Sequence, residues 1–203
     1  LDKETSGLMV FGKTPLANRA LTAQFAARSV HKIYQLHTDR RVPVGEQVVS
    51  SGIARAGDHY VSSADGEPAE TRFRLLSDGL VQAQPLTGRT HQIRVHAAAS
   101  GFPILGDTLY GGSAWPRVCL HAAELRFAHP ASGELLRFNA PADFSADARQ
   151  TLRTALIDAG STTACRLIHG ASDGWPGWYL DRLGGVLLSQ SAGELSAEAL
   201  AYL

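Results

Sequence analysis

The segment 87–96 contains a cluster of arginine, histidine and amide side chains that follows directly after Gly88. Its members able to bind an anion or to carry a proton are Arg89, His91, Gln92, Arg94 and His96. No proline or glycine follows until Gly101, so the pattern predicts a helix that starts just after Gly88. On such a helix His91 and Arg94 share a face, and a guanidinium on a rigid element suits a carboxylate or a phosphate. A solvated basic helix face is an equally good interpretation of this composition alone.

Two further side chains could take part in chemistry from other parts of the chain. Asp2 lies in the polar turn 1–7, where an acidic residue is usually a turn former. Tyr34 falls in the segment 32–37, and a tyrosine in a strand belongs to the core more often than to a catalytic site. Arg94 is then a candidate charge partner for a carboxylate.

Other kinds of chemistry find little support in the sequence. His91 and His96 are five residues apart, off the i, i+4 spacing that places two imidazoles on one metal. His121 and Glu124 join them only if the fold brings them together. Ser6 lacks the Gly-x-Ser-x-Gly context of an activated serine. The chain also has no Gly-x-Gly-x-x-Gly, so the usual dinucleotide fingerprint is missing.

The composition is that of a globular chain with a local excess of positive charge. The 203 residues are 44% hydrophobic and carry no net charge. Between residues 1 and 41, however, seven lysines and arginines face three aspartates and glutamates, and such a surface can hold a polyanion. Cys119 and Cys165 form no Cys-x-x-Cys pair, which fits a reducing cytoplasm. No apolar run reaches membrane-spanning length, and no signal peptide is visible, so we expect a cytoplasmic protein without a membrane partner.

Strands and two helices are expected to position these residues. Thr14 and Pro15 are typical of a helix start, and Ala17, Leu21 and Phe25 form one apolar stripe behind them. The segments predicted to be strands are 8–11, 32–37, 71–76, 80–83 and 135–138, with a hairpin turn at 77–79. The stretch 43–68, rich in glycine, serine, proline and valine, is predicted to be a loop with short strands.

A domain boundary is expected near residue 155. A short amphipathic helix over 142–159 has the pattern of a connector, and a glycine-punctuated composition begins at Thr162. The sequence therefore predicts one domain over 1–155 and the start of a second over 156–203. The missing initiator methionine and the end in a helical pattern indicate a piece of a longer polypeptide.

Several ordered motifs resemble those of the RluA-type RNA pseudouridine synthases. The segment 1–8, Leu-Asp-Lys-Glu-Thr-Ser-Gly-Leu, is similar to the family's Arg-Leu-Asp-x-x-Thr-Ser-Gly-Leu signature without its leading arginine. The segment 32–34 is similar to its Lys-x-Tyr strand, and 87–96 matches its later motif. The segments 101–107 and 120–141 continue the match in the family's order, so that the resemblance covers residues 1 to about 144.

This resemblance implies an α+β catalytic domain, with a mixed, mainly antiparallel sheet and flanking helices, followed by the start of a small β-rich domain. The implied activity is the isomerisation of uridine to pseudouridine in structured RNA, without a metal or an organic cofactor. Asp2 would be the catalytic carboxylate, which attacks the target nucleotide or assists glycosidic cleavage. Tyr34 would stack on the base and could help to remove the C5 proton, and Arg94 would pair with Asp2.

The resemblance also implies an RNA partner. The residues expected to contact RNA are Lys3, Lys32, Arg89, His91 and Gln92. Such contacts to phosphates position an RNA without specifying its sequence, and the uracil must leave its stack to be reached. Ribosomal RNA is favoured and transfer RNA is possible, while the oligomeric state is left open.

A second resemblance lies in the tail. The segment 166–184 is similar to the early Arg-Leu-x-x-Gly-x-x-Asp-Gly-x-Pro-Gly-x-x-x-Asp-Arg segment of class I ribosomal RNA cytosine methyltransferases. Trp175 and Trp178 stand where smaller apolar residues are usual. A methyl-donor site would lie beyond Leu203, and the whole protein would then combine two RNA-modifying enzymes. The alternative is a small structural β unit.

Two rival functions remain at this point: a non-catalytic RNA-binding module, and a bifunctional protein whose main activity is cytosine methylation. The first is tested by whether Asp2 lies within about 6 Å of Arg94, as strong coupling requires. Because strands normally upstream of the catalytic aspartate are absent, we expect an unpaired sheet edge. The fragment alone is therefore expected to be poorly stable and weakly active or inactive.

Overall fold

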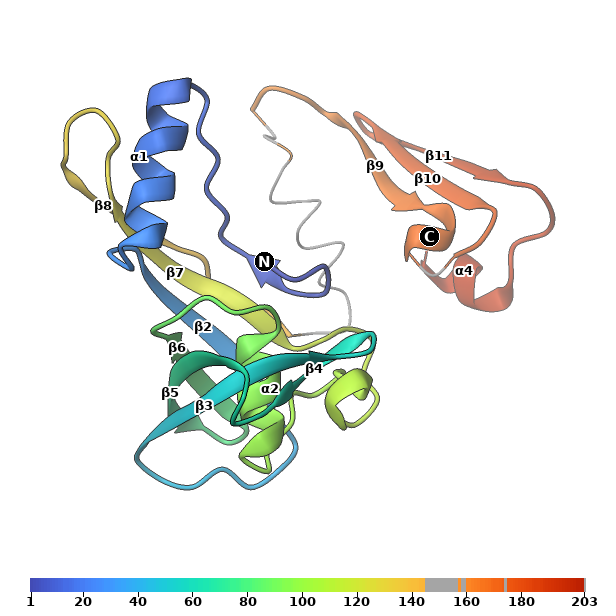
Figure 1. Ribbon diagram of the computed structural model, residues 1–203. Coiled ribbons are helices and arrows are strands. Elements are labelled where there is room, and N and C mark those ends of the chain that lie inside the picture. Colours follow the sequence, from blue (N-terminus) through green and yellow to red (C-terminus); the bar gives the residue numbers. More distant parts are fainter. Residues whose placement is uncertain (145–156, 158–159, 174, 203) are drawn as a thin grey trace. The chain divides into compact units, whose positions relative to one another are not determined.

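The computed structural model describes residues 1–144, 157, 160–173 and 175–202 (Figure 1). The chain divides into two compact units, Leu1–Ala146 and Asp147–Leu203. The boundary predicted near residue 155, and the predicted connecting helix from residue 145 onward, lie outside the described residues. Among the described residues, no helix combines the length and the apolar character needed to cross a bilayer.

The first unit is built on an eight-stranded sheet with the strand order β1-β7-β2-β6-β5-β3-β4, and β8 also pairs with β7. The strands are β1 (Ser6–Gly7), β2 (His31–His37), β3 (Glu46–Ala56), β4 (His59–Ser62), β5 (Glu67–Ser77), β6 (Leu80–Pro85), β7 (Leu120–Ala128) and β8 (Leu135–Asn139). All pairs are antiparallel except β1 with β7. The expected α+β fold with a mainly antiparallel sheet is therefore confirmed.

Helix α1 (Pro15–Ala26) begins as the sequence predicts. The Thr14 hydroxyl accepts a hydrogen bond from the Ala17 amide at 3.1 Å, and Pro15 occupies the first turn, where its missing N–H costs nothing. Leu21 packs with Val30 of the following turn and with Leu125 and Phe127 of β7. Phe25 departs from the predicted apolar stripe, because its side chain is 44% exposed.

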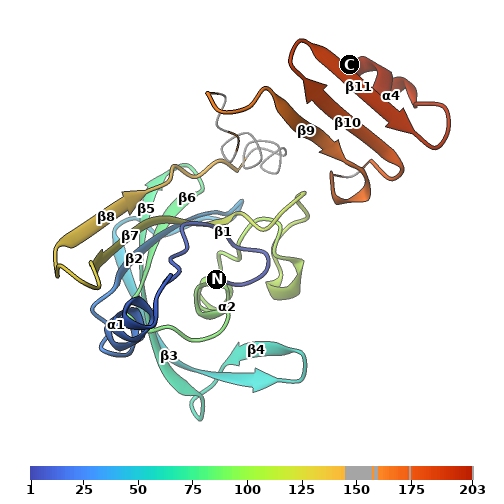
Figure 2. The same ribbon diagram turned by 90° about the horizontal axis from the view of Figure 1, so that it is seen from above.

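Helix α2 (Gln92–Ala99) covers one face of the sheet and is buried along six of its eight residues (Figure 2). Its Ile93 and Ala97 join a core that contains Phe73 of β5 and Phe102, whose rings meet edge to face at 5.3 Å. A helix buried in this way is not the solvated basic face that composition alone allowed.

The start of α2 corrects the sequence prediction. The helix begins at Gln92 rather than just after Gly88, because His91 takes a left-handed conformation with φ of 54°. The side-chain oxygen of Gln92 accepts hydrogen bonds from the Arg89 amide at 3.0 Å and from the Thr87 hydroxyl at 2.6 Å. These contacts hold residues 87–91 as a loop, and His91 therefore lies outside the helix.

Two strand predictions are also wrong. No strand covers 8–11; the only pairing in this region is that of Ser6 and Gly7, and Leu8 adds one amide hydrogen bond to the Ala122 carbonyl at 3.0 Å. The stretch 43–68, predicted to be a loop with short strands, holds the short strand β4 but also the eleven-residue strand β3. The apolar alternation of Val49 and Ile53 is strong enough to override the glycines and serines around it.

The second unit is a small β-rich body, as expected. Its three antiparallel strands are β9 (Ala164–His169), β10 (Trp178–Leu183) and β11 (Val186–Ser191), in the order β11-β10-β9. The short 3₁₀ turn η2 (Gly170–Asp173) follows β9, and α4 (Ala197–Tyr202) follows the sheet. Ile168, Trp178, Leu180 and Ala199 form its core.

Candidate active site

Arg94 is the central side chain of the candidate site. It lies in the first turn of α2, and its side chain is 3% exposed. Its Nε and Nη2 donate hydrogen bonds of 2.7 and 2.8 Å to the two carboxylate oxygens of Asp107, which is 1% exposed. Asp107 directly precedes the 3₁₀ turn η1 (Thr108–Tyr110). This bidentate pair fixes the plane of the guanidinium and turns its remaining nitrogen, Nη1, toward other groups.

The third nitrogen of Arg94, which is not bonded to Asp107, faces the N-terminal turn. Its Nη1 lies 3.7 Å from Oδ2 of Asp2 and 3.3 Å from Oε2 of Glu4. The predicted contact between Asp2 and Arg94 is thus present, and 92 residues of chain separate the two partners. Burial opposes the charged guanidinium, but Asp107, Asp2 and Glu4 together outweigh that effect and raise the pKa of Arg94.

Strand β1 holds the turn that carries Asp2. The turn closes with a hydrogen bond of 3.0 Å from the Thr5 amide to the Asp2 carbonyl. Ser6 pairs with His121 of β7, and its hydroxyl is hydrogen bonded to Nδ1 of that histidine at 2.8 Å. Gly7 has φ of 111°, and a Cβ there would lie 2.4 Å from the Ala122 carbonyl oxygen. Only glycine allows so close an approach, which explains the place of Gly7 in the motif.

Tyr110 supports Arg94 from the side. Its ring centroid lies 5.0 Å from the guanidinium carbon, within the range of a cation–π contact. The Tyr110 hydroxyl is hydrogen bonded to Nδ1 of His91 at 2.7 Å and accepts a bond from the Tyr60 amide at 3.1 Å. His91 is therefore tied to the residues that support Arg94.

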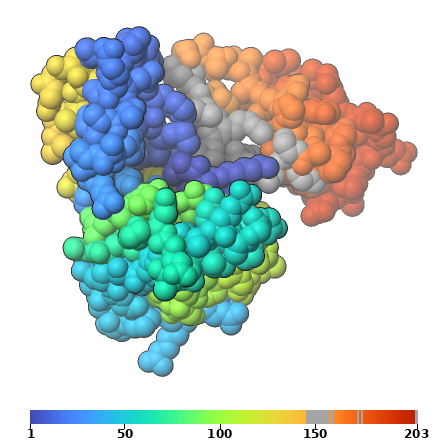
Figure 3. Space-filling view, in the orientation of Figure 1, coloured from blue at the N-terminus to red at the C-terminus, as the bar shows by residue number. Residues whose placement is uncertain are grey.

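A cavity of about 260 Å³ lies over this group. Its lining includes Asp2, Thr5, Phe25, Lys32, Tyr34, Arg89 and His91. In the space-filling view the N-terminal segment, in dark blue, lies at the surface beside the green part of the chain that contains α2 (Figure 3). Burial, aided by the charge of Asp2, raises the pKa of Tyr34 to about 12. The phenol of Tyr34 is therefore uncharged at neutral pH.

The residues expected to contact RNA do not all lie on an open surface. Lys32 and Arg89 line the cavity, and Lys32 donates to the Thr87 carbonyl at 3.4 Å. Arg89 pairs with Glu67 at 2.5 Å. Lys3 is exposed but is not part of the cavity lining.

Gln92, also expected to contact RNA, belongs to the lining of the cavity but is buried. Its side chain is 4% exposed, and its amide nitrogen donates to the Glu70 carbonyl at 2.9 Å and to the Thr71 hydroxyl at 3.0 Å. With its oxygen already bonded to the loop, Gln92 holds the chain in shape rather than offering free groups to RNA.

Sequence reasoning missed three residues of this site: Asp107, Glu4 and Tyr110. Asp107 is the last residue of the segment 101–107, which resembles a family motif but was given no role. Because a guanidinium can bind both oxygens of a carboxylate, this acidic residue was a candidate partner for Arg94. Glu4 shares a turn with Asp2, and Tyr110 follows Asp107 by one turn of chain. Within the part of the chain that the structure describes, no group of three histidine, cysteine or acidic side chains could hold a metal ion.

The chain is similar in sequence to known RNA pseudouridine synthases. Residues 1–99 match the model of the family described as RNA pseudouridylate synthase. The chain is 38% identical over 161 residues to "Ribosomal large subunit pseudouridine synthase C" of Yersinia pestis, which covers 70% of this chain and 50% of that protein. It is 36% identical over 159 residues to "Ribosomal large subunit pseudouridine synthase D" of Zymomonas mobilis, over 69% and 50% of the two chains.

The fold is shared with a solved human structure. "Human RNA Pseudouridylate Synthase Domain Containing 1" superposes with a TM-score of 0.58 at 28% identity, over 67% of this chain and 65% of that one. The chain spans about half the length of the curated relatives it matches.

Proposed function

Because the first unit carries an RluA-family RNA pseudouridine synthase domain, we propose that the protein isomerises uridine to pseudouridine in ribosomal RNA. The observation that carries the proposal is the carboxylate of Asp2, which lines a base-sized cavity and lies 3.7 Å from the buried guanidinium of Arg94. The two relatives described above are synthases of the large ribosomal subunit, which supports ribosomal RNA as the substrate class.

The reaction breaks the bond between N1 of uracil and C1′ of the ribose and forms a bond from C5 to C1′. The Asp2 carboxylate attacks the nucleotide or assists the cleavage, and the guanidinium of Arg94 lies beside it. Arg94 also serves Asp107 and Glu4, so its charge is shared among three carboxylates. At 3.7 Å the Asp2 oxygen is beyond a direct hydrogen bond. The Asp2 carboxylate is therefore close to a positive charge without being held by a hydrogen bond from it, which suits a nucleophile.

Tyr34 supplies a flat surface and a neutral hydroxyl. With a pKa of about 12, only roughly one phenol in 10⁵ is ionised at pH 7. Tyr34 therefore acts as a stacking partner for the uracil, and its hydroxyl can pass a proton only if a second group takes it up. The cavity of about 260 Å³ lies below the roughly 300–1,000 Å³ of pockets for drug-sized ligands, and this supports one flipped base as its occupant.

The test uses the purified whole protein and unmodified ribosomal RNA of the large subunit, with pseudouridine mapped by carbodiimide-blocked primer extension. Wild type is expected to give new stops that Asp2→Asn abolishes. Glu4→Gln is the matched control, because Glu4 also contacts Arg94 but does not line the cavity, and it is expected to keep the stops. Equal stops with Asp2→Asn would remove Asp2 from the mechanism. RNA binding without stops in wild type would favour the non-catalytic module.

For the second unit we propose kinship with the early segment of ribosomal RNA cytosine methyltransferases. Arg166 and Asp181, both part of the motif 166–184, form a bidentate pair with hydrogen bonds of 2.8 and 2.9 Å between β9 and β10. This pair gives two of the charged motif positions a structural reason. A glycine-rich methyl-donor loop in the sequence that follows residue 203 of the whole protein would support the proposal, and its lack would contradict it.

A further inference from the structure

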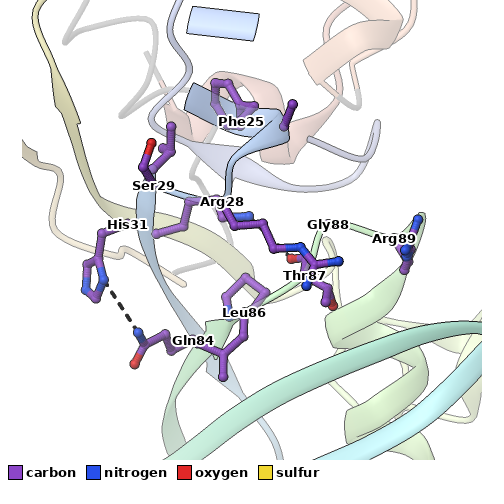
Figure 4. Close-up of a pocket in the computed structure, with 13 residues that line it drawn as sticks. Phe25, Arg28, Ser29, His31, Gln84, Leu86, Thr87, Gly88 and Arg89 are labelled. Atoms are coloured by element: carbon purple, nitrogen blue, oxygen red, sulfur yellow. Dashed lines mark hydrogen bonds between the residues drawn. The ribbon is translucent and has the colours of Figure 1, made fainter. Parts of the chain in front are cut away.

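A second pocket, of about 430 Å³, adjoins the cavity that holds Asp2. It lies between the C-terminal end of α1, the start of β2 and the loop that leads from β6 to α2. Figure 4 shows Phe25 and Ser29 on one side of this pocket and Thr87, Gly88 and Arg89 on the other, with His31 hydrogen bonded to Gln84 at one end. Phe25, Lys32 and Arg89 line both cavities, so the two lie side by side. We call this second cavity the Arg28 pocket.

The lining of the Arg28 pocket is positively charged. It contains Arg28, Lys32 and Arg89, together with His31, and none of its thirteen lining residues is acidic. Arg89 has Glu67 as a partner. Arg28 and Lys32 form no ion pair with any described residue, and burial lowers the pKa of Lys32. A half-buried ammonium without a carboxylate partner, at the junction of two cavities, suits an anionic ligand.

The backbone at Arg28 gives an independent reason. Arg28 has φ of 57°, and its amide bonds to the Phe25 carbonyl at 3.1 Å while the Ser29 amide bonds to the Gln24 carbonyl at 3.0 Å. This is the Schellman ending of a helix, in which glycine is the usual residue at the left-handed position. Arginine is strained there, and glycine would satisfy the fold better. The demands of the fold therefore do not explain the arginine.

Phe25 provides the remaining feature of the pocket. Its ring is 44% exposed and stands at the junction of the two cavities. An exposed aromatic ring beside unpaired cations is the combination that binds single-stranded nucleic acid, because bases stack on the ring while cations hold phosphates. An acidic peptide would use the cations but would have no use for the ring.

We propose that the Arg28 pocket binds the nucleotide next to the target uridine. Lys32 and Arg28 hold its phosphates, and its base stacks on Phe25. This inference rests on the proposed function, because it takes the target uridine to lie in the cavity beside Asp2. A chain that leaves that cavity past Lys32 enters the Arg28 pocket directly.

The test measures the affinity of the purified protein for a transcript of large-subunit ribosomal RNA over a range of salt concentrations. Arg28→Gly removes the cation and relieves the backbone, so its melting temperature is expected to equal or exceed that of wild type. Its affinity is expected to fall about tenfold, as the loss of a charged hydrogen bond predicts, and the slope of log K against log salt to fall by about 0.7–0.9. Arg28→Lys is expected to restore the slope.

Two further variants complete the design. Phe25→Ala is expected to weaken binding without changing the salt slope, because the ring carries no charge. Arg74→Ala is the control: Arg74 is an exposed arginine of β5 outside both cavities, and its removal is expected to change neither quantity.

The outcomes separate this proposal from the function on which it rests. Pseudouridine formation by wild type, with the slope and affinity unchanged in Arg28→Gly, would overturn the pocket alone. A wild type that forms no pseudouridine would overturn the proposed function and this inference with it. Displacement of the RNA by poly-glutamate as readily as by unlabelled RNA would assign the pocket to an acidic protein segment and overturn the inference.

Discussion

At the scale of single residues, the site depends on one guanidinium that serves three carboxylates. Asp107 takes two of its nitrogens, and Asp2 and Glu4 share the third. The best-bonded partner of Arg94 is thus Asp107, while Asp2, the proposed nucleophile, is the most loosely held. The tight pair sets the position of Arg94, and the loose pair leaves Asp2 free to react.

Asp107→Asn tests this division of roles. Removal of one charge from a buried, bidentate pair is expected to lower the free energy of unfolding by about 3–5 kcal/mol. Pseudouridine formation is expected to fall as well, even at a temperature where the variant is fully folded, because Arg94 can then turn toward Asp2. Urea unfolding and single-turnover rates measure the two effects. Asp78→Asn, in the exposed turn between β5 and β6, serves as a control, and a stability loss no larger than that of the control would contradict the assignment.

The sequence identified Asp2, Tyr34 and Arg94 but not Asp107, and the reason is physical. The motif around Arg94 identifies the guanidinium. Which carboxylate lies beside it depends on the conformation of the chain between Ala99 and η1, which the motif does not specify. The left-handed conformation of His91 is equally hidden from the sequence, since only a small share of non-glycine residues adopt a positive φ. The start of α2 and the partner of Arg94 are therefore determined by the tertiary structure and not by the local sequence.

At the scale of elements, β1 is only two residues long and yet positions Asp2. Gly7→Ala would bring a Cβ within 2.4 Å of the Ala122 carbonyl oxygen and would push β1 away from β7. Activity is expected to be lost at temperatures where the unit remains folded. Gly45→Ala is a matched control, because Gly45 also has a positive φ, of 97°, but has no atom within 4 Å of the added methyl group. Equal rates of pseudouridine formation in the two variants would show that the close approach of β1 to β7 is not needed.

The strand and helix predictions succeeded where the signal was local. The alternation in 32–37, the turn 77–79 and the Thr14–Pro15 helix start each specify an element without help from the rest of the chain. The prediction of a strand over 8–11 was wrong because two structures share this apolar composition. One is a buried strand, and the other is an extended, unpaired segment whose alternate residues Leu8 and Val10 pack into a cluster. Whether such a segment pairs is decided by its neighbours.

A buried histidine joins α2 to two strands and makes the unit sensitive to acid. His96 is fully buried, and its ring nitrogens bond to the hydroxyls of Thr71 on β5 at 2.8 Å and Ser51 on β3 at 3.1 Å. Burial lowers the pKa of His96 below its usual 6.5. No charged group is bonded to the ring, so protonation would leave a buried cation without compensation.

The sign of the pH effect follows from that shift. Since the pKa is lower in the folded state, the unfolded state binds the proton first, and the contribution of His96 to stability is present above pH 6.5 and lost as the pH falls through the folded-state pKa. Urea unfolding at pH 7.5 and pH 5 is expected to show a smaller loss of stability in His96→Gln than in wild type. His129→Gln, at an exposed turn, is the control and is expected to keep the wild-type loss. The same loss in both variants would exclude His96 as the source.

At the scale of the whole molecule, the chain carries two units whose sequence signals differ in strength. The first could be predicted in fold class and in three of its central residues, because several motifs occur in a fixed order. The second was predicted as a β-rich body, and the structure agrees, but its function rests on one short segment. The boundary between them could be placed only roughly, since composition changes gradually between residues 142 and 162.

The single parallel pairing of β1 with β7 has a consequence for how the active site assembles. Ser6 and His121 are 115 residues apart in the chain, whereas Arg94 and Asp107 are separated by 13. Contacts of large sequence separation carry a greater loop-closure cost and are slower to form than local ones. We therefore expect the guanidinium to acquire its structural partner early on the way to the native state, and Asp2, the proposed nucleophile, to join later. Recovery of activity then reports the completion of folding, not merely the formation of the sheet.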